Sequence, residues 1–312
     1  MRAASIFVAV LVTASATSCG GSKEALVHPT VPGARPVLTT AASEEGPAAA
    51  GGTLAWMQSP RVNPAPTRSR TSVFVRASGR TIRVNPPGTY AQTGGIDGHM
   101  LVLSITGGGR SRLARYDLSK KQLVYLPRYV NDGAWLWRPD LDGDRVLYGA
   151  IVPGRSAVLR YEIRLADLDR HTVRVLARLD GHNEYAAPGQ LQADWATWVA
   201  CPESACNVWR ENLATGRAED APDPDSLVYT QIGPAVDRRG VVYFDRTLAS
   251  CGNAEIRRWD GRHDSLLVRL PASYAFQYAY LAKATRTLYF DLGACAHTAT
   301  ADVYSLDVGR GP

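Results

Sequence analysis

The sequence predicts an all-β protein, a six-bladed β-propeller of four-stranded antiparallel blades. Two observations carry this prediction. A short apolar run recurs six times at intervals of 45 to 50 residues, with equivalent positions at Trp56, Leu103, Tyr148, Trp198, Tyr243 and Tyr289. The segments between the runs are rich in β-branched and aromatic residues and are interrupted by Gly, Pro and Asp, which is typical of hairpins. The 312-residue chain is 45% hydrophobic, with 28 Gly and 19 Pro, so a core is available but turns are frequent.

The N-terminal segment has the pattern of an export signal. Arg2 precedes an apolar run from Ile6 to about Ala16, and small residues then lead to Cys19. This run is too short for a stable transmembrane helix but suits a signal peptide, which we expect at 1–18. No later segment has the roughly eighteen apolar residues that a membrane span requires.

The stretch from Ala16 to Cys19 resembles the lipobox of bacterial lipoproteins, although Ala16 stands where Leu is commoner. The resemblance implies that Cys19 is lipidated and becomes the new N-terminus, with 19–33 as a flexible tether. The alternative is ordinary signal cleavage, which leaves a free secreted protein. Gly20 follows Cys19, so no Asp directs retention at an inner membrane. We expect an exported protein, lipid-anchored at the cell surface or at the periplasmic face of a membrane.

Each repeat unit contains several strand-like segments, and together the units form a single propeller over 34–308. The apolar runs are TLAWMQ (53–58), MLVLSI (100–105), RVLYGAI (145–151), WATWVAC (195–201), GVVYFDR (240–246) and RTLYFDL (286–292). Polar turns precede four of them: IDGH (96–99), LDGD (141–144), VDRRG (236–240) and AKATR (282–286). Each run is followed by a hairpin loop and a second strand, and often by a third strand that ends at Pro. Four short strands per unit are the pattern of a propeller blade.

This order of turn, aromatic strand, second aromatic strand and short basic strand resembles the repeats of the TolB-like propeller family. The resemblance covers nearly the whole mature chain and implies a role in protein interaction, although a shared fold does not determine function. The units should begin near residues 47, 91, 133, 187, 230 and 274.

The last unit lacks its outermost strand, because the chain after Val308 consists of the tail 309–312. The segment ARPVLTT (34–40) has the basic, β-branched character of the missing strand. We predict that it pairs with 301–308 and closes the ring, because an open ring would leave unpaired strand edges.

The five cysteines predict two disulfides. Once Cys19 is assigned to the lipid, the remaining four, Cys201, Cys206, Cys251 and Cys295, all fall in hairpin loops on one face of the propeller. An exported protein favours disulfides. Of the three possible pairings we favour Cys201 with Cys206 and Cys251 with Cys295. A zinc site is the rival interpretation, but CPESAC (201–206) has no partner pair with zinc-ligand spacing, and we expect neither a metal nor a cofactor.

Several motifs suggest catalysis or ligand binding and have simpler structural interpretations. DLDGD (140–144) has the alternating carboxylates of a calcium loop but lacks the later Glu, so it reads as a turn. TGGGR (106–110) lacks the Lys-Ser/Thr ending of a phosphate-binding loop. None of the six His residues accompanies a nucleophile motif.

Two sets of polar residues are candidates for a binding site. The connection DGHNEYAAPGQ (180–190) is the most polar, and such connections surround the axial channel of a propeller, where ligands dock. Its candidates are His182, Asn183, Glu184 and Tyr185. Asp245, Arg246 and Asp291 end their strands at the level of the cysteine loops. An ordinary solvated loop and ordinary strand ends are the alternatives.

The formal charge of +6 could indicate a nucleic-acid partner, but the arginines are scattered and accompany no nucleic-acid-binding motif. We expect a monomeric, non-catalytic propeller that binds an unidentified envelope protein or glycan. The alternative is a secreted hydrolase or lyase acting on glycans, which would need paired carboxylates, and a third possibility is an interaction domain that regulates the product of a neighbouring gene. A shallow, aromatic mouth would favour binding; a deep pocket with paired carboxylates would favour the enzyme.

Overall fold

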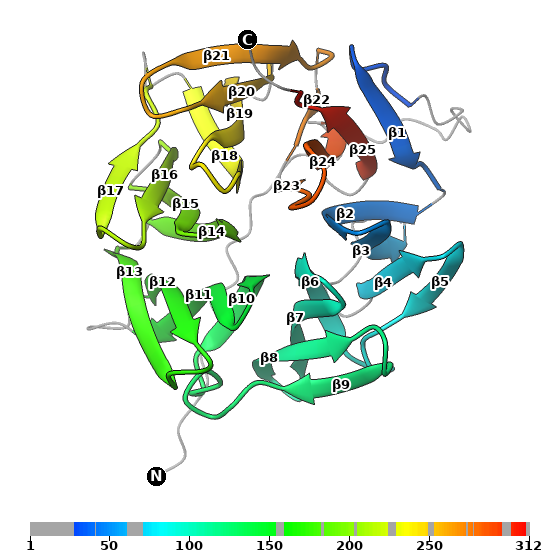
Figure 1. Ribbon diagram of the computed structural model, residues 1–312, viewed down its shortest axis with the longest axis vertical. Helices are drawn as coiled ribbons and strands as arrows, with labels where there is room; N and C mark the ends of the chain where they lie inside the picture. The colour runs from blue at the N-terminus through cyan, green and yellow to red at the C-terminus, as the bar shows by residue number, and fades with distance from the viewer. Residues whose placement is uncertain are drawn as a thin grey trace, which may run out of the picture.

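The computed structural model describes residues 28–40, 42–60, 71–153, 159–181, 184–202, 205–223, 229–248, 253–272, 274–276, 278–294 and 301–309. It confirms the predicted six-bladed β-propeller. Six antiparallel sheets surround a central axis (Figure 1), and the blades follow one another around the ring in the order of the chain. In this part of the chain no helix is long and apolar enough to cross a membrane.

The first five blades each have four strands, which run from the axis outward in chain order. Blade I consists of β2 (Ala42–Ala50), β3 (Thr53–Pro60), β4 (Ser72–Ala77) and β5 (Arg80–Arg83). Blade II consists of β6 (Tyr90–Asp97), β7 (Met100–Gly107), β8 (Arg110–Asp117) and β9 (Gln122–Tyr125). Blade III consists of β10 (Trp135–Asp142), β11 (Arg145–Pro153), β12 (Leu159–Asp167) and β13 (Thr172–Asp180).

Blade IV consists of β14 (Tyr185–Gln192), β15 (Trp195–Cys201), β16 (Asn207–Asn212) and β17 (Arg217–Asp220). Blade V consists of β18 (Tyr229–Val236), β19 (Val242–Leu248), β20 (Glu255–Trp259) and β21 (Asp264–Arg269). Blade VI has a divided inner strand, β22 (Tyr274–Ala275) and β23 (Ala279–Leu281), followed by β24 (Thr287–Ala294) and β25 (Ala301–Asp307).

The N-terminal strand β1 (Ala34–Leu38) completes blade VI, as the sequence predicts. It pairs antiparallel with β25, from Ala34 opposite Leu306 to Leu38 opposite Val303. In Figure 1, β1 forms the outer edge of blade VI and β25 lies next to it on the inner side. The ring is therefore closed by strands from opposite ends of the chain.

The hydrophobic core consists of six clusters, and each cluster lies between two neighbouring blades. Tyr243 and Phe290, for example, belong to the cluster between blades V and VI, and Trp56 belongs to the one between blades VI and I. The recurrent aromatic residues of the sequence thus fill the spaces between blades, and this explains why the repeat is visible at all.

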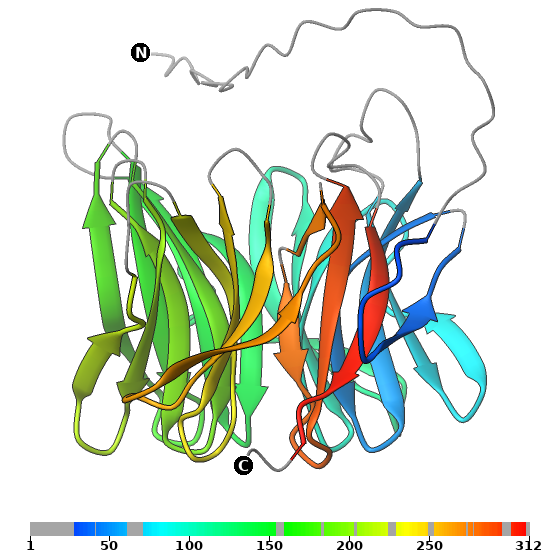
Figure 2. The same ribbon diagram turned by 90° about the horizontal axis from the view of Figure 1, so that it is seen from above.

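The propeller has two faces, seen edge-on in Figure 2. Inner strands start at the upper face, where Tyr90, Trp135 and Tyr185 lie. They end at the lower face, where short turns lead into the second strand of each blade (Figure 2).

Candidate binding site at the axial cavity

Every inner strand is interrupted at the same level of the propeller. In five blades the pairing with the second strand shifts across two residues, and in blade VI the strand breaks between β22 and β23. The shifts enclose Gly46 and Pro47, Gly94 and Gly95, Arg138 and Pro139, Gly189 and Gln190, and Gly233 and Pro234. Such bulges bend a strand and redirect its side chains.

The glycines allow the blades to approach closely at the axis. A Cβ on Gly94 would lie 2.2 Å from the carbonyl oxygen of Pro139, and one on Gly189 would lie 2.5 Å from that of Pro234. Each of these contacts joins one blade to the next, so the bulges form a tight ring of backbone around the axis.

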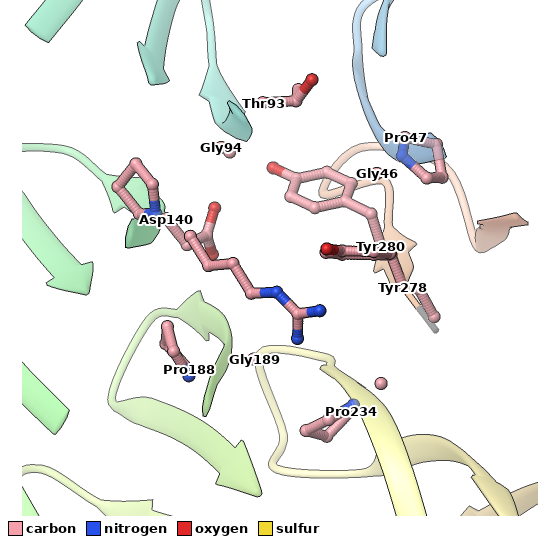
Figure 3. A pocket seen from close by; sticks show the side chains of 15 residues that line it. Gly46, Pro47, Thr93, Gly94, Asp140, Pro188, Gly189, Pro234, Tyr278 and Tyr280 are labelled. Carbon is pink, nitrogen blue, oxygen red and sulfur yellow. The ribbon is translucent and has the colours of Figure 1, made fainter. Parts of the chain in front are cut away.

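A cavity of about 60 Å³ lies inside this ring. Gly46, Gly94, Gly189 and Pro234, from four different blades, surround it together with Tyr278 and Tyr280 of blade VI (Figure 3). The strand β23 lies on the axial side of blade VI, near the centre of the ring (Figure 1). The Tyr280 hydroxyl donates to Ile96 O at 2.8 Å, and Gln190 Nε2 donates to Leu281 O at 2.7 Å. These bonds join blade VI to blades II and IV and close the axis below the cavity.

Arg138 occupies the position in blade III where blades I, II, IV and V have glycine. Its φ is 44°, close to the 56° of Gly46 and the 61° of Gly233. A left-handed conformation costs a residue with a Cβ about 1–2 kcal/mol. Unfavourable backbone conformations of this kind cluster at functional sites, so Arg138 is the strongest candidate in the cavity.

The Arg138 guanidinium lies against aromatic rings. Its carbon is 3.9 Å from the centroid of the Tyr278 ring and 5.4 Å from that of Trp137. Among the described residues it forms no ion pair. Desolvation lowers the pKa of Arg138, but Tyr185, Tyr278 and Asp291 outweigh it and raise the pKa above its usual value, so the cation persists.

Buried polar atoms accompany Arg138 at the cavity. Thr93 Oγ1, Arg138 Nε and Asp140 Oδ1 are buried and have no hydrogen-bond partner among the described residues. Burial raises the pKa of Asp140 to about 7, although Lys283 and the Leu191 amide favour its ionised form. Burial also raises the pKa of Glu45, opposed by Ser43 and Arg138. The cavity is therefore small, polar and dominated by a cation that lacks a counterion within hydrogen-bond reach.

Aromatic residues extend the site toward the upper face. The rings of Trp137 and Tyr185 are 5.2 Å apart, and those of Tyr161 and Tyr185 are 5.6 Å apart. Trp135, at the start of β10, is 37% exposed, which is unusual for so large an apolar side chain. Arg138 thus lies beside a tryptophan–tyrosine cluster.

The structure brings one member of the predicted polar connection to this site. Tyr185 packs on Trp137 and contributes to the charge environment of Arg138. Glu184 immediately precedes β14, whereas His182 and Asn183 lie outside the described residues.

Asp245 and Asp291 lie inside the propeller instead of on an exposed rim. Asp245 is 0% exposed and Asp291 is 2% exposed. Asp245 accepts a hydrogen bond from Phe276 N at 3.1 Å, and so links blade V to blade VI. Asp291 accepts from Gly46 N at 3.1 Å and Tyr278 N at 3.0 Å, linking blade VI to blade I. Burial, the largest cause, raises the pKa of Asp245 well above its usual value. Both carboxylates hold inner strands in place.

Arg246 is held by an ion-pair network in blade V. Its nitrogens lie 3.0 Å from a Glu255 oxygen and 3.4 Å from an Asp264 oxygen, and its guanidinium lies 5.3 Å from the Tyr229 ring centroid. Arg257 pairs with the same two acids. Two carboxylates thus already neutralise the terminal nitrogens of Arg246, although its Nε has no hydrogen-bond partner among the described residues, and this pairing makes it less suited than Arg138 to bind an external anion.

The structure contains a disulfide between Cys201 and Cys206, the pairing favoured from the sequence. Cys19, Cys251 and Cys295 lie outside the described residues. Within the described chain no group of three His, Cys, Asp or Glu residues is arranged to hold a metal. In the DLDGD turn, Asp142 pairs with Arg145 at 2.9 Å and Lys283 at 2.9 Å, as a structural residue does.

Sequence reasoning missed Arg138, although the sequence contains a signal for it. Aligned by their bulges, the inner strands read EGPA (45–48), TGGI (93–96), WRPD (137–140) and IGPA (232–235). Arg138 stands out only when the inner strands are aligned by their bulges. An alignment of the repeats on their second strands, which are easier to recognise in the sequence, does not reveal it.

Comparisons with known proteins identify the fold. No protein-family model and no curated protein matches the chain. TolB from Acinetobacter baumannii aligns with a TM-score of 0.55 at 12% identity, over 83% of this chain and 64% of that one. A Trypanosoma rangeli sialidase aligns with a TM-score of 0.57 at 9% identity, over 90% and 60%.

The β-propeller domain of the Trilobed protease from Pyrococcus furiosus aligns with a TM-score of 0.51 at 10% identity, over 86% of this chain and 96% of that domain. The chain spans less than two thirds of the TolB and sialidase chains. At such low identity these likenesses concern architecture. The chain has the TolB-like six-bladed propeller fold.

Proposed function

We propose that this protein is an exported binding propeller, anchored by a lipid on Cys19, whose upper face binds a protein partner through an acidic group that contacts Arg138. The observation that carries the proposal is Arg138 itself. At the axis an arginine replaces the glycine of the sister blades, in a left-handed backbone conformation that is unfavourable for a residue with a Cβ. Its guanidinium is hydrogen-bonded to Tyr278 but forms no ion pair with any described residue. A carboxylate forms two parallel hydrogen bonds with a guanidinium, which makes it the natural ligand group.

The surroundings of Arg138 support a protein partner. Trp137, Tyr185 and the exposed Trp135 supply the aromatic surface that is enriched in protein interfaces. The chain shares its fold with TolB, and the resemblance of its repeats to the TolB-like family implies a role in protein interaction, which agrees with this proposal. The exported location rests on the N-terminal signal and the lipobox resemblance, and the Cys201–Cys206 disulfide is compatible with it.

The cavity is less suited to glycan hydrolysis. A retaining glycosidase requires two carboxylates about 5 Å apart. Asp140 is the one acidic residue among those that line the cavity, and it is committed to the Leu191 amide through Oδ2. Binding is therefore the better-supported function.

The test uses an oligo-aspartate peptide and an oligo-asparagine peptide of equal length, titrated calorimetrically into the wild-type protein and two variants. Arg138→Gly removes the guanidinium and introduces the residue of the sister blades, so the fold should tolerate it. Arg170→Gly removes an arginine whose side chain is 81% exposed, in a turn of the same blade. We expect the wild-type protein to bind the aspartate peptide but not the asparagine peptide. Arg138→Gly should lower the affinity for the aspartate peptide about tenfold or more, and Arg170→Gly should leave it unchanged. Equal binding by all three proteins would contradict the proposal.

A further inference from the structure

The turns of the lower face divide into an acidic half and a basic half. In blades II, III and IV the turns after the inner strands contain or adjoin Asp97, Asp142, Asp144 and Asp194. In blade V the equivalent turn contains Arg238 and Arg239 beside a single acid, Asp237, and in blade VI it contains Lys283 and Arg286. The same structural turn therefore carries opposite charge on the two sides of the ring.

A pocket of about 440 Å³ lies between the two basic turns. Gln192 from the end of β14, Tyr243 from β19 and Val308 after β25 also line it. The backbone here is well held, since Arg286 O accepts from Val308 N at 2.9 Å and Asp237 O accepts from Gly240 N at 2.9 Å. None of the residues that line this pocket lines the axial cavity.

Two of the four cations are available to a ligand. Lys283 Nζ bonds Asp142 Oδ1 at 2.9 Å, and Arg239 lies 3.3 Å from Asp237 of its own turn. Arg238 and Arg286 form no ion pair within the described residues. They approach the pocket from different blades, as a two-sided clamp does. Arginine is the preferred partner of phosphate oxygens, because its planar fork matches their geometry.

The remaining polar groups suit a ligand with both negative charge and a hydroxyl group. Asp237, the acid of the pocket, already accepts bonds from Arg239 N at 2.8 Å and Val241 N at 3.0 Å. Burial raises the pKa of Tyr243, so its hydroxyl stays protonated. Gln192 is 6% exposed, and its Oε1 accepts no hydrogen bond from any described residue. A buried acceptor without a partner is rare in folded proteins and would be satisfied by a donor on a ligand.

We propose that this lower pocket binds a phosphate group, with Arg238 and Arg286 as its principal ligands. The phosphate belongs either to a small soluble ester or to the headgroup of a lipid. This site is separate from the axial site and does not depend on the function proposed there.

Two assays test the proposal. The first is phosphorus-31 NMR with glycerol 3-phosphate and with inorganic phosphate. The second is co-sedimentation with phosphatidylcholine vesicles, with and without phosphatidylglycerol. The variant is Arg238→Gln with Arg286→Gln. The matched control is Arg170→Gln, a turn arginine on the same face of blade III. Near-UV circular dichroism establishes that each variant retains the wild-type fold, and Arg286→Gln alone provides a milder second variant.

We expect wild type and control to bind a phosphate probe, and the double variant to bind at least about tenfold more weakly. Binding of the soluble probes but not of the vesicles would assign the phosphate to a small ester. Binding confined to vesicles that contain phosphatidylglycerol would assign it to a lipid. Absence of binding in all arms, or equal binding by the double variant and wild type, would overturn the proposal.

Discussion

Arg138 shows how much a single backbone angle can reveal. Four sister blades have glycine at its position, in the bulge of the inner strand. The fold therefore does not require an arginine there, and its stacking on Tyr278 returns only about the energy of a cation–π contact. The guanidinium is therefore better explained by the binding role proposed for it than by a contribution to stability.

The backbone argument predicts an inverted order of stability for two variants. Arg138→Ala and Arg138→Gly both remove the guanidinium, but alanine keeps a Cβ at a φ of 44°. We expect the glycine variant to be more stable by about 1 kcal/mol, measured by urea unfolding. At Arg35 in the extended strand β1, the same two substitutions should rank the other way. An alanine variant at 138 as stable as the glycine variant would contradict the strain.

Asp140 predicts a pH dependence. Its pKa of about 7 in the folded protein exceeds the ordinary 3.8, so the native state holds the proton more tightly than the unfolded chain does. This contribution to stability is complete below about pH 4 and is lost as the pH rises to about 7. Asp140→Asn should therefore be more stable than wild type at pH 8, by at most about 4 kcal/mol, with the advantage disappearing at pH 4.

Thermal melts between pH 4 and pH 8 measure this difference. Asp144→Asn, which replaces a largely exposed acid in the same blade, is the control. A pH-independent effect of Asp140→Asn would show that the carboxyl does not titrate in this range.

At the scale of elements, the second strands were predictable and the inner strands were not. Second strands such as β7 and β19 are buried on both faces and have continuous apolar sequences. Inner strands are broken by bulges that contain Gly and Pro, which resemble turns in a sequence. The inner strand of blade VI is divided into β22 and β23, so its role in closing the axis could not be predicted from the sequence. The closing strand was predictable because it completes an otherwise incomplete repeat.

The closure by β1 predicts that a distant substitution weakens the whole ring. Leu38 is 6% exposed and packs with Trp56 and Val303 between blades VI and I. Leu38→Ala should lower the free energy of unfolding by about 2–4 kcal/mol. Arg35→Gln, on the same strand but exposed, should change it by less than about 0.5 kcal/mol. Urea denaturation distinguishes them, and similar values for both would mean that β1 contributes little to closure.

At the scale of the whole molecule, the sequence predicts architecture better than function. Repeats report the apolar spaces between blades, and these are set by local strand patterns. A site depends on residues that the ring brings together from different blades, such as Arg138 with Tyr278, or Arg238 with Arg286. Asp245 and Asp291 illustrate the reverse difficulty. Polar residues at strand ends look like ligand contacts in a sequence, and here they join one blade to the next.

The attachment of the molecule to a membrane gives the last prediction. If Cys19 is acylated, the residues between Cys19 and His28 join the lipid to the propeller. The tether is shorter than the predicted 19–33, because His28 lies 2.7 Å from Asp302 and Val31, 3% exposed, packs in the core between blades V and VI. One lipid chain gives only marginal binding, so stable anchoring requires the several chains of a mature lipoprotein. Cys19→Ser should therefore move the protein from the membrane fraction to the soluble fraction and abolish incorporation of labelled palmitate. Ser22→Ala, within the same tether, should leave both unchanged. A Cys19→Ser protein that remains membrane-bound would require another attachment, and the lower pocket, for which we propose phosphate binding, would then be the first place to test.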